Sequence, residues 1–203
     1  MRGLEIVIIM SLVGLTQAWA QSESTFARAR IVMIVAPKDF TDQEYADPRT
    51  VFEAFGALVC VASSGKDAAV SHNGATLKID KAIAEIAPDQ FDALVLVGGA
   101  GAMAYLMDDE ALRSMIASAV KSGKVVAAIC IAPAVLAHAG VLRNVQATCF
   151  PDRRIISVLK LNGAAYTTQS VVVSGRIITA NGPGAAKGFA SMVIEALRKR
   201  QGK

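Results

Sequence analysis

The sequence is poor in the residues that mark several common kinds of site. Aromatic residues make up 5% of the chain, and the basic residues form no stripe, so there is no nucleic-acid-binding footprint. Histidine occurs only at His72 and His138. The cysteines, Cys60, Cys130 and Cys149, form no CxxC pair and no Cys/His cluster, which argues against metal binding. We therefore expect no metal and no organic cofactor.

The first twenty residues differ in character from the rest of the chain. Residues 6–15 are almost wholly apolar, and Ala18-Trp19-Ala20 is a small-x-small cleavage pattern. This arrangement is typical of a secretory signal peptide, and the apolar run is too short for a permanent membrane span. The alternative is that it forms a first hydrophobic strand of the fold. The pattern predicts a signal peptide over 1–20, a flexible mature N-terminus over 21–29, a periplasmic or secreted protein, and no membrane association after cleavage.

The remainder, residues 30–203, is predicted to form one domain of alternating strands and helices. Apolar runs without alternation predict strands buried on both faces, and their alternation with helical segments favours a parallel sheet covered on both sides. We expect strands at 30–36, 57–62, 93–97 and 125–129, a short strand within 147–150, a hairpin over 171–179, helices at 43–56, 79–86, 110–121 and 187–199, and loops at 37–42 and 63–74.

Cys130 lies at the most informative point of the chain. The apolar run 125–129 leads directly into it, and Pro133 follows in the first turn of a helical segment. A sharp strand-to-helix turn exposes a side chain at the carboxyl edge of a parallel sheet, where ligands bind in open α/β folds. The N-terminus of the following helix is expected to lower the pKa of the thiol. The alternative is a buried core cysteine.

Two further segments are expected at the same edge of the sheet. Gly99-Ala100-Gly101-Ala102-Met103-Ala104 follows a strand, and the backbone amides of Gly99 and Ile131 would together hold a developing oxyanion. The same segment also matches a weak dinucleotide fingerprint, or a plain tight turn. Glu44 follows the first strand. Its carboxyl group would donate a hydrogen bond to a thiolate, serve as a base, or remain a solvated helix-start glutamate.

Taken together, these segments resemble the DJ-1/PfpI family. The specific elements are Ala128-Ile129-Cys130-x-x-Pro133, Val97-Gly98-Gly99, Glu44 with Pro48, and Asn181-Gly182-Pro183-Gly184. The resemblance implies an α/β flavodoxin-like three-layer sandwich with a nucleophile elbow, and a homodimer or larger homo-oligomer. It also implies a reactive cysteine at Cys130, a site glutamate at Glu44, and oxyanion amides at Gly99 and Ile131.

The chain departs from the family pattern in its histidines. Ile131-Ala132 follows the cysteine, and Phe150 stands where a family histidine precedes the proline that matches Pro151. No Cys–His dyad is therefore expected, which argues against peptidase activity. The resemblance implies glyoxalase- or deglycase-like action on a small carbonyl such as an aldehyde. The alternatives are a redox-sensing or holdase-like stress protein, and a ligand-binding module. A Cys130–Cys149 disulfide is a weaker prediction, since Cys149 and Phe150 should face opposite ways.

Overall fold

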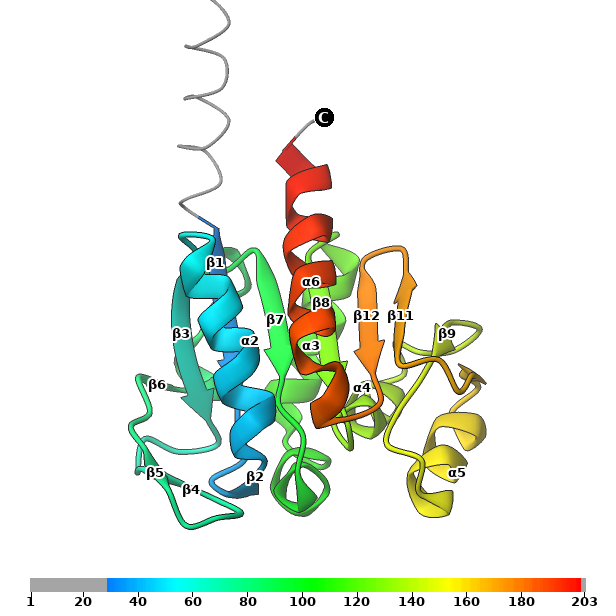
Figure 1. Ribbon diagram of the computed structural model, residues 1–203, viewed down its shortest axis with the longest axis horizontal. Helices are drawn as coiled ribbons and strands as arrows, with labels where there is room; N and C mark the ends of the chain where they lie inside the picture. Colours follow the sequence, from blue (N-terminus) through cyan, green and yellow to red (C-terminus); the bar gives the residue numbers. More distant parts are fainter. Residues whose placement is uncertain (1–28, 202–203) are drawn as a thin grey trace, which may run out of the picture.

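The computed structural model describes residues 29–201, so the predicted signal peptide and residues 21–28 lie outside the described part of the chain. A seven-stranded sheet forms the centre of the molecule, in the order β11-β12-β8-β7-β1-β3-β6 (Figure 1). Every neighbouring pair is parallel except the hairpin β11–β12. The strands are β1 (Arg30–Ile34), β3 (Leu58–Ser63), β6 (Lys81–Ala82), β7 (Ala93–Leu96), β8 (Val125–Ile129), β11 (Val171–Ser174) and β12 (Ile177–Ala180).

Helices cover both faces of this sheet. On one face lie α2 (Asp42–Ala54) and α6 (Ala186–Gln201), which pack side by side in Figure 1. On the other lie α3 (Glu110–Lys121) and α4 (Pro133–His138), and α5 (Arg153–Leu161) packs against α4. The predicted α/β flavodoxin-like sandwich is thus confirmed. No helix in the described residues is both long and apolar enough to cross a membrane.

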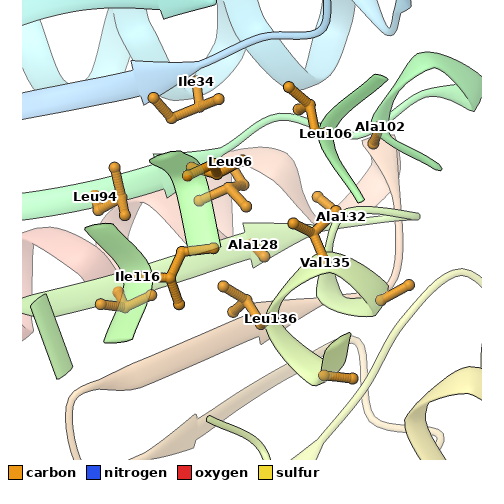
Figure 2. Close-up of a cluster of buried hydrophobic side chains, with 14 of the residues drawn as sticks. Ile34, Leu94, Leu96, Ala102, Leu106, Ile116, Ala128, Ala132, Val135 and Leu136 are labelled. Atoms are coloured by element: carbon orange, nitrogen blue, oxygen red, sulfur yellow. The ribbon is translucent and has the colours of Figure 1, made fainter. Parts of the chain in front are cut away.

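The core is divided by the sheet into two layers. Along β8, Val126 and Ala128 point into the layer beneath α3 and α4, whereas Val125, Ala127 and Ile129 point into the layer beneath α2 and α6. Figure 2 shows the first layer, in which side chains of α3 and α4 meet those of the sheet. Burying one large apolar side chain contributes roughly 1.5–3 kcal/mol, so both layers hold β8 firmly in place.

The helix predicted at 79–86 is wrong. This segment contains β6 and a single 3₁₀ turn, η1 (Ile83–Glu85). The cause is Asp80, whose carboxylate accepts a hydrogen bond from the Val61 amide at 2.8 Å while its own amide donates to the Val61 carbonyl at 2.9 Å. These bonds hold the segment extended along the edge of β3, and this tertiary pairing outweighs the helical spacing of the isoleucines.

Several short elements were not predicted. The loops at 37–42 and 63–74 contain β2 (Lys38–Phe40) and β4 (Ala69–Ser71), which form a second sheet with β5 (Thr76–Leu77). The strand expected within 147–150 lies instead at β9 (Gln146–Ala147), paired with β10 (Ala165–Tyr166). The remaining turns are η2 (Pro88–Gln90), the π-helix η3 (Ala102–Leu106) and η4 (Pro183–Ala185).

Candidate active site

The candidate site lies at the point from which the chain builds the sheet first to one side and then to the other. From β1 the chain passes to β3 on one side, and β7 and β8 later extend the sheet on the other side. Ligands in open α/β sheets bind at such a switch point, beside the carboxyl ends of the strands. The connections that leave these ends, β1 to α2, β7 to η3 and β8 to α4, gather at the lower edge of the sheet in Figure 1.

Cys130 occupies a strained turn immediately after β8. Its φ angle is 63°, in the left-handed region that L-residues with a side chain seldom adopt. Two backbone hydrogen bonds hold it there: its amide donates to the Ala180 carbonyl at 2.8 Å, and its carbonyl accepts from the Phe150 amide at 2.7 Å. The residue is 6% exposed. The predicted elbow is therefore present, and strain of this kind persists only where the surroundings determine it.

Glu44 faces this cysteine from the first turn of α2. It is completely buried, which rules out the solvated helix-start alternative. Gly98 lies between the two residues, because a Cβ atom built on it would overlap Glu44 Oε2 and lie 2.6 Å from Cys130 Cβ. The absence of a side chain at residue 98 is thus what allows the carboxyl group and the thiol to approach one another.

Burial dominates the electrostatics of this pair. It raises the pKa of Glu44 from 4.5 to about 7, against the smaller opposing effects of the Cys130 thiol and the Gly98 amide. Neither Glu44 oxygen has a hydrogen-bond partner of good geometry among the described residues. A buried carboxyl group with few donors holds its proton more tightly than one in water.

The pKa of the Cys130 thiol is raised as well. Burial, followed by the negative charge of Glu44, raises the pKa of Cys130, and the backbone amides of Ile131 and Gly99 oppose this. The expected lowering of the thiol pKa by the helix N-terminus is therefore wrong. Helix α4 has only six residues, and its terminus does not offset the loss of water and the nearby carboxylate.

The backbone amides of Ile131 and Gly99 both lower the pKa of the Cys130 thiol, which places them beside Cys130 together with Glu44. Gly99 has a φ of 111°, and a Cβ atom there would overlap the Asp39 carbonyl and lie 2.8 Å from Phe40 Cα. Close packing against the β2 segment therefore requires glycine and fixes the direction of the Gly99 amide.

Comparison with known proteins identifies the family of the chain. The model of the DJ-1/PfpI family matches residues 29–196, nearly all of the described chain. The chain belongs to the DJ-1/PfpI family.

Individual relatives agree with this assignment. An uncharacterised protein of Methanocaldococcus jannaschii is 38% identical over 88% of this chain and 87% of its own length. A deglycase of Pyrococcus abyssi is 33% identical over 75% of this chain and 90% of its own. Among solved structures, a ThiJ/PfpI domain protein of Brachyspira murdochii has a TM-score of 0.78 and 31% identity, covering 85% of this chain and 97% of that one.

The two histidines of this DJ-1/PfpI protein lie on other parts of the fold. His72 is exposed and follows β4, and its amide donates to the Phe40 carbonyl. His138 ends α4, where its Nε2 lies 3.4 Å from a carboxylate oxygen of Asp108. Within residues 29–201, no group of three or more His, Cys, Asp or Glu side chains is arranged to hold a metal ion.

The other two cysteines differ from Cys130 in their surroundings. Cys60 is half-buried in β3, and burial raises the pKa of its thiol. Cys149 is fully buried in the core layer beneath α3 and α4, where burial raises its pKa to about 12. Cys130 packs with the opposite layer, and all three cysteines are free thiols. The structure therefore gives no support to the Cys130–Cys149 disulfide.

The surroundings of Phe150 could not be predicted from the sequence. The residue is 41% exposed, and its ring lies beside Gly182. The side-chain Nε2 of Gln43, at the start of α2, donates to the Pro183 carbonyl at 3.5 Å. The sequence signal in this region was the Asn-Gly-Pro-Gly segment before the last helix, which shows a turn but not what it contacts.

Proposed function

We propose that this protein is an enzyme that acts on small reactive carbonyl compounds, with glyoxalase- or deglycase-like chemistry, through covalent attack by Cys130. The observation that carries the proposal is the buried pair of Cys130 and Glu44, in which the pKa of Glu44 is raised to about 7. A catalytic base works best when its pKa lies near the working pH. Because the pKa of the thiol is raised, Cys130 needs such a base.

In the first step the Glu44 carboxylate takes the thiol proton as the sulfur attacks the aldehyde carbon. A C–S bond forms, the C=O π electrons move to oxygen, and a hemithioacetal oxyanion results. The amides of Gly99 and Ile131 lie at the sulfur and would donate hydrogen bonds to that oxygen. The protonated Glu44 then returns a proton to the oxyanion, which completes the hemithioacetal.

For an α-oxoaldehyde the remaining steps need only water. A proton leaves the hemithioacetal carbon and is delivered to the adjacent ketone carbon by way of an enediol, so that the first carbon is oxidised to a thioester and the second is reduced to an alcohol. Hydrolysis of the thioester releases an α-hydroxy acid and restores the thiol. Glu44 is the buried titratable group placed to carry these protons, and the proposal therefore needs no imidazole.

The test is steady-state turnover of methylglyoxal to lactate by the purified protein, with Cys130→Ser, Glu44→Gln and Cys60→Ser variants. We expect activity in the wild type and in Cys60→Ser, and its loss in the two site variants. Cys60→Ser is the matched control, because it removes a thiol from β3 outside the site. Equal turnover by Cys130→Ser and wild type would refute covalent attack by this cysteine.

A second candidate is a redox-sensing protein whose Cys130 is reversibly oxidised. The positions of the two histidines favour it, since one follows β4 and the other pairs with Asp108, and the two amides at the sulfur would also stabilise a sulfenate. Turnover separates the two candidates. A sensor gives no lactate, and peroxide converts its Cys130 to a sulfenic acid that dithiothreitol reduces.

Export is a further proposal, supported by the signal-peptide pattern over residues 1–20. Expression in a bacterial host, followed by fractionation and N-terminal sequencing, tests it. We expect a periplasmic chain that begins near Gln21, and an uncleaved cytoplasmic chain would refute the proposal.

A further inference from the structure

Phe150 is a large apolar side chain that the fold leaves partly open to solvent next to the elbow. The residue is 41% exposed, and its Cδ2 atom lies 3.7 Å from the position that a Cβ atom on Gly182 would occupy. Gly182 follows β12, whose last residue, Ala180, accepts the hydrogen bond from the Cys130 amide. The ring therefore lies against the same stretch of backbone that holds the nucleophile.

The backbone beneath this ring is fixed to the elbow itself. The Phe150 amide donates to the Cys130 carbonyl at 2.7 Å, and the Phe150 carbonyl accepts from the Asp152 amide at 2.8 Å. Asp152 is the N-cap of α5, where its carboxylate accepts from the Arg154 amide at 2.8 Å. The ring is thus carried on a segment tied at both ends and is not on a free loop.

The ring is one part of a continuous rim. From Phe150 the rim passes to Gly182 and Pro183, and the hydrogen bond from Gln43 to the Pro183 carbonyl connects it to the first turn of α2, which carries Glu44. The groups that shift the pKa of the Cys130 thiol are the Glu44 carboxyl group and the backbone amides of Ile131 and Gly99. Phe150 adds a partly exposed aromatic ring on the segment whose backbone is bonded to this turn.

We propose that Phe150 is a specificity-determining residue that stacks on planar substituents, so that the site prefers α-oxoaldehydes whose ketone carries an aromatic ring over those that carry a methyl group. For turnover, this inference rests on the proposed carbonyl chemistry. Offset or edge-to-face contact between aromatic rings is worth enough to change a rate by roughly two- to tenfold. An apolar but non-aromatic residue at the same position retains burial and loses this ring contact.

The first experiment compares kcat/KM for phenylglyoxal and methylglyoxal in the wild type, Phe150→Leu and Phe55→Leu. Phe55 is an equally exposed phenylalanine at the opposite end of α2, where it lies under the Arg198 guanidinium, and it is the matched control. We expect the phenylglyoxal-to-methylglyoxal ratio to fall roughly two- to tenfold in Phe150→Leu and to stay unchanged in Phe55→Leu.

The second experiment needs no turnover. Phenacyl bromide and bromoacetone each alkylate a thiol with formation of a C–S bond and loss of bromide, and they differ in bearing a phenyl or a methyl group. Alkylation of Cys130 is followed by peptide mass mapping, and each rate is divided by the rate with 2-mercaptoethanol. We expect the normalised ratio to favour phenacyl bromide in the wild type and to fall by the same factor in Phe150→Leu.

The two experiments separate the inference from the proposed function. If neither dicarbonyl is turned over but the alkylation ratio falls in Phe150→Leu, the aromatic contact of Phe150 is supported and the proposed carbonyl activity is refuted. If turnover occurs and neither ratio changes in Phe150→Leu, the proposed carbonyl activity is supported and the role of Phe150 is refuted. Unchanged ratios together with an altered sedimentation coefficient would assign the ring to a contact between copies of the chain.

Discussion

Replacing Glu44 by glutamine should change how the stability of the fold depends on pH. Burial raises the pKa of this carboxyl group from 4.5 to about 7, so the folded chain holds its proton more tightly than the unfolded chain does. The stabilisation from that proton is fully present below pH 4.5, declines between pH 4.5 and 7, and is absent above pH 7. At about 1.4 kcal/mol per pKa unit, the loss is on the order of 3 kcal/mol.

The assay is urea unfolding of the wild type and Glu44→Gln at half-unit intervals from pH 4 to pH 8. Glutamine resembles the protonated carboxyl group in shape and does not titrate. The free energy of unfolding of the variant, minus that of the wild type, should therefore rise by about 3 kcal/mol across this range. Taking the difference removes the contribution of surface carboxylates, which titrate in both proteins. A difference that stays constant with pH would show that Glu44 is not held protonated by burial.

Three further outcomes are expected. Gly98→Ala should abolish activity and destabilise the fold by roughly 1–3 kcal/mol, because the added Cβ atom would lie 2.6 Å from Cys130 Cβ. In the control Gly65→Ala the added Cβ atom has no neighbour within 4 Å, so this variant should unfold at the wild-type urea concentration. Iodoacetamide at pH 8 should modify Cys130 before Cys60, because the buried Glu44, whose pKa is raised to about 7, faces the Cys130 thiol and can take its proton; peptide mapping that finds Cys60 first would contradict this. Asp109→Ala should cost about 1 kcal/mol in urea unfolding, because its carboxylate caps the N-terminus of α3 at 2.9 Å; an unchanged midpoint would exclude the cap.

The sequence was informative where one physical requirement dominated each position. Apolar runs such as Val125–Ile129 predicted buried parallel strands, and the helix at Glu110–Lys121 was predicted with its observed bounds. Once these elements are placed, the carboxyl ends of neighbouring strands must meet. For that reason the sequence predicts Cys130, Glu44, Gly99 and Ile131 at one edge of the sheet.

The wrong helix at 79–86 has its cause in a partner that is distant along the chain. Nothing within residues 79–86 shows that Asp80 would bind the backbone of Val61 and keep the segment extended. Helix α5 was not predicted, although the sequence carries local signals for it. Asp152 caps its start, and Ile155 and Leu159 share one buried face. The pKa of the thiol was misjudged because the helix terminus is visible in sequence, while the depth of burial is not.

The two hydrogen bonds that hold the Cys130 backbone come from segments synthesised after it, since Phe150 and Ala180 both follow in the chain, while Glu44 is made well before it. During synthesis the cysteine therefore exists for a time without the two hydrogen bonds that hold its turn. In that interval it is an ordinary thiol, open to any oxidant or electrophile that it meets. The turn at Cys130 is complete only once the last parallel strand, β12, has joined the sheet beside β8, because the Ala180 carbonyl that accepts from the Cys130 amide is the end of that strand.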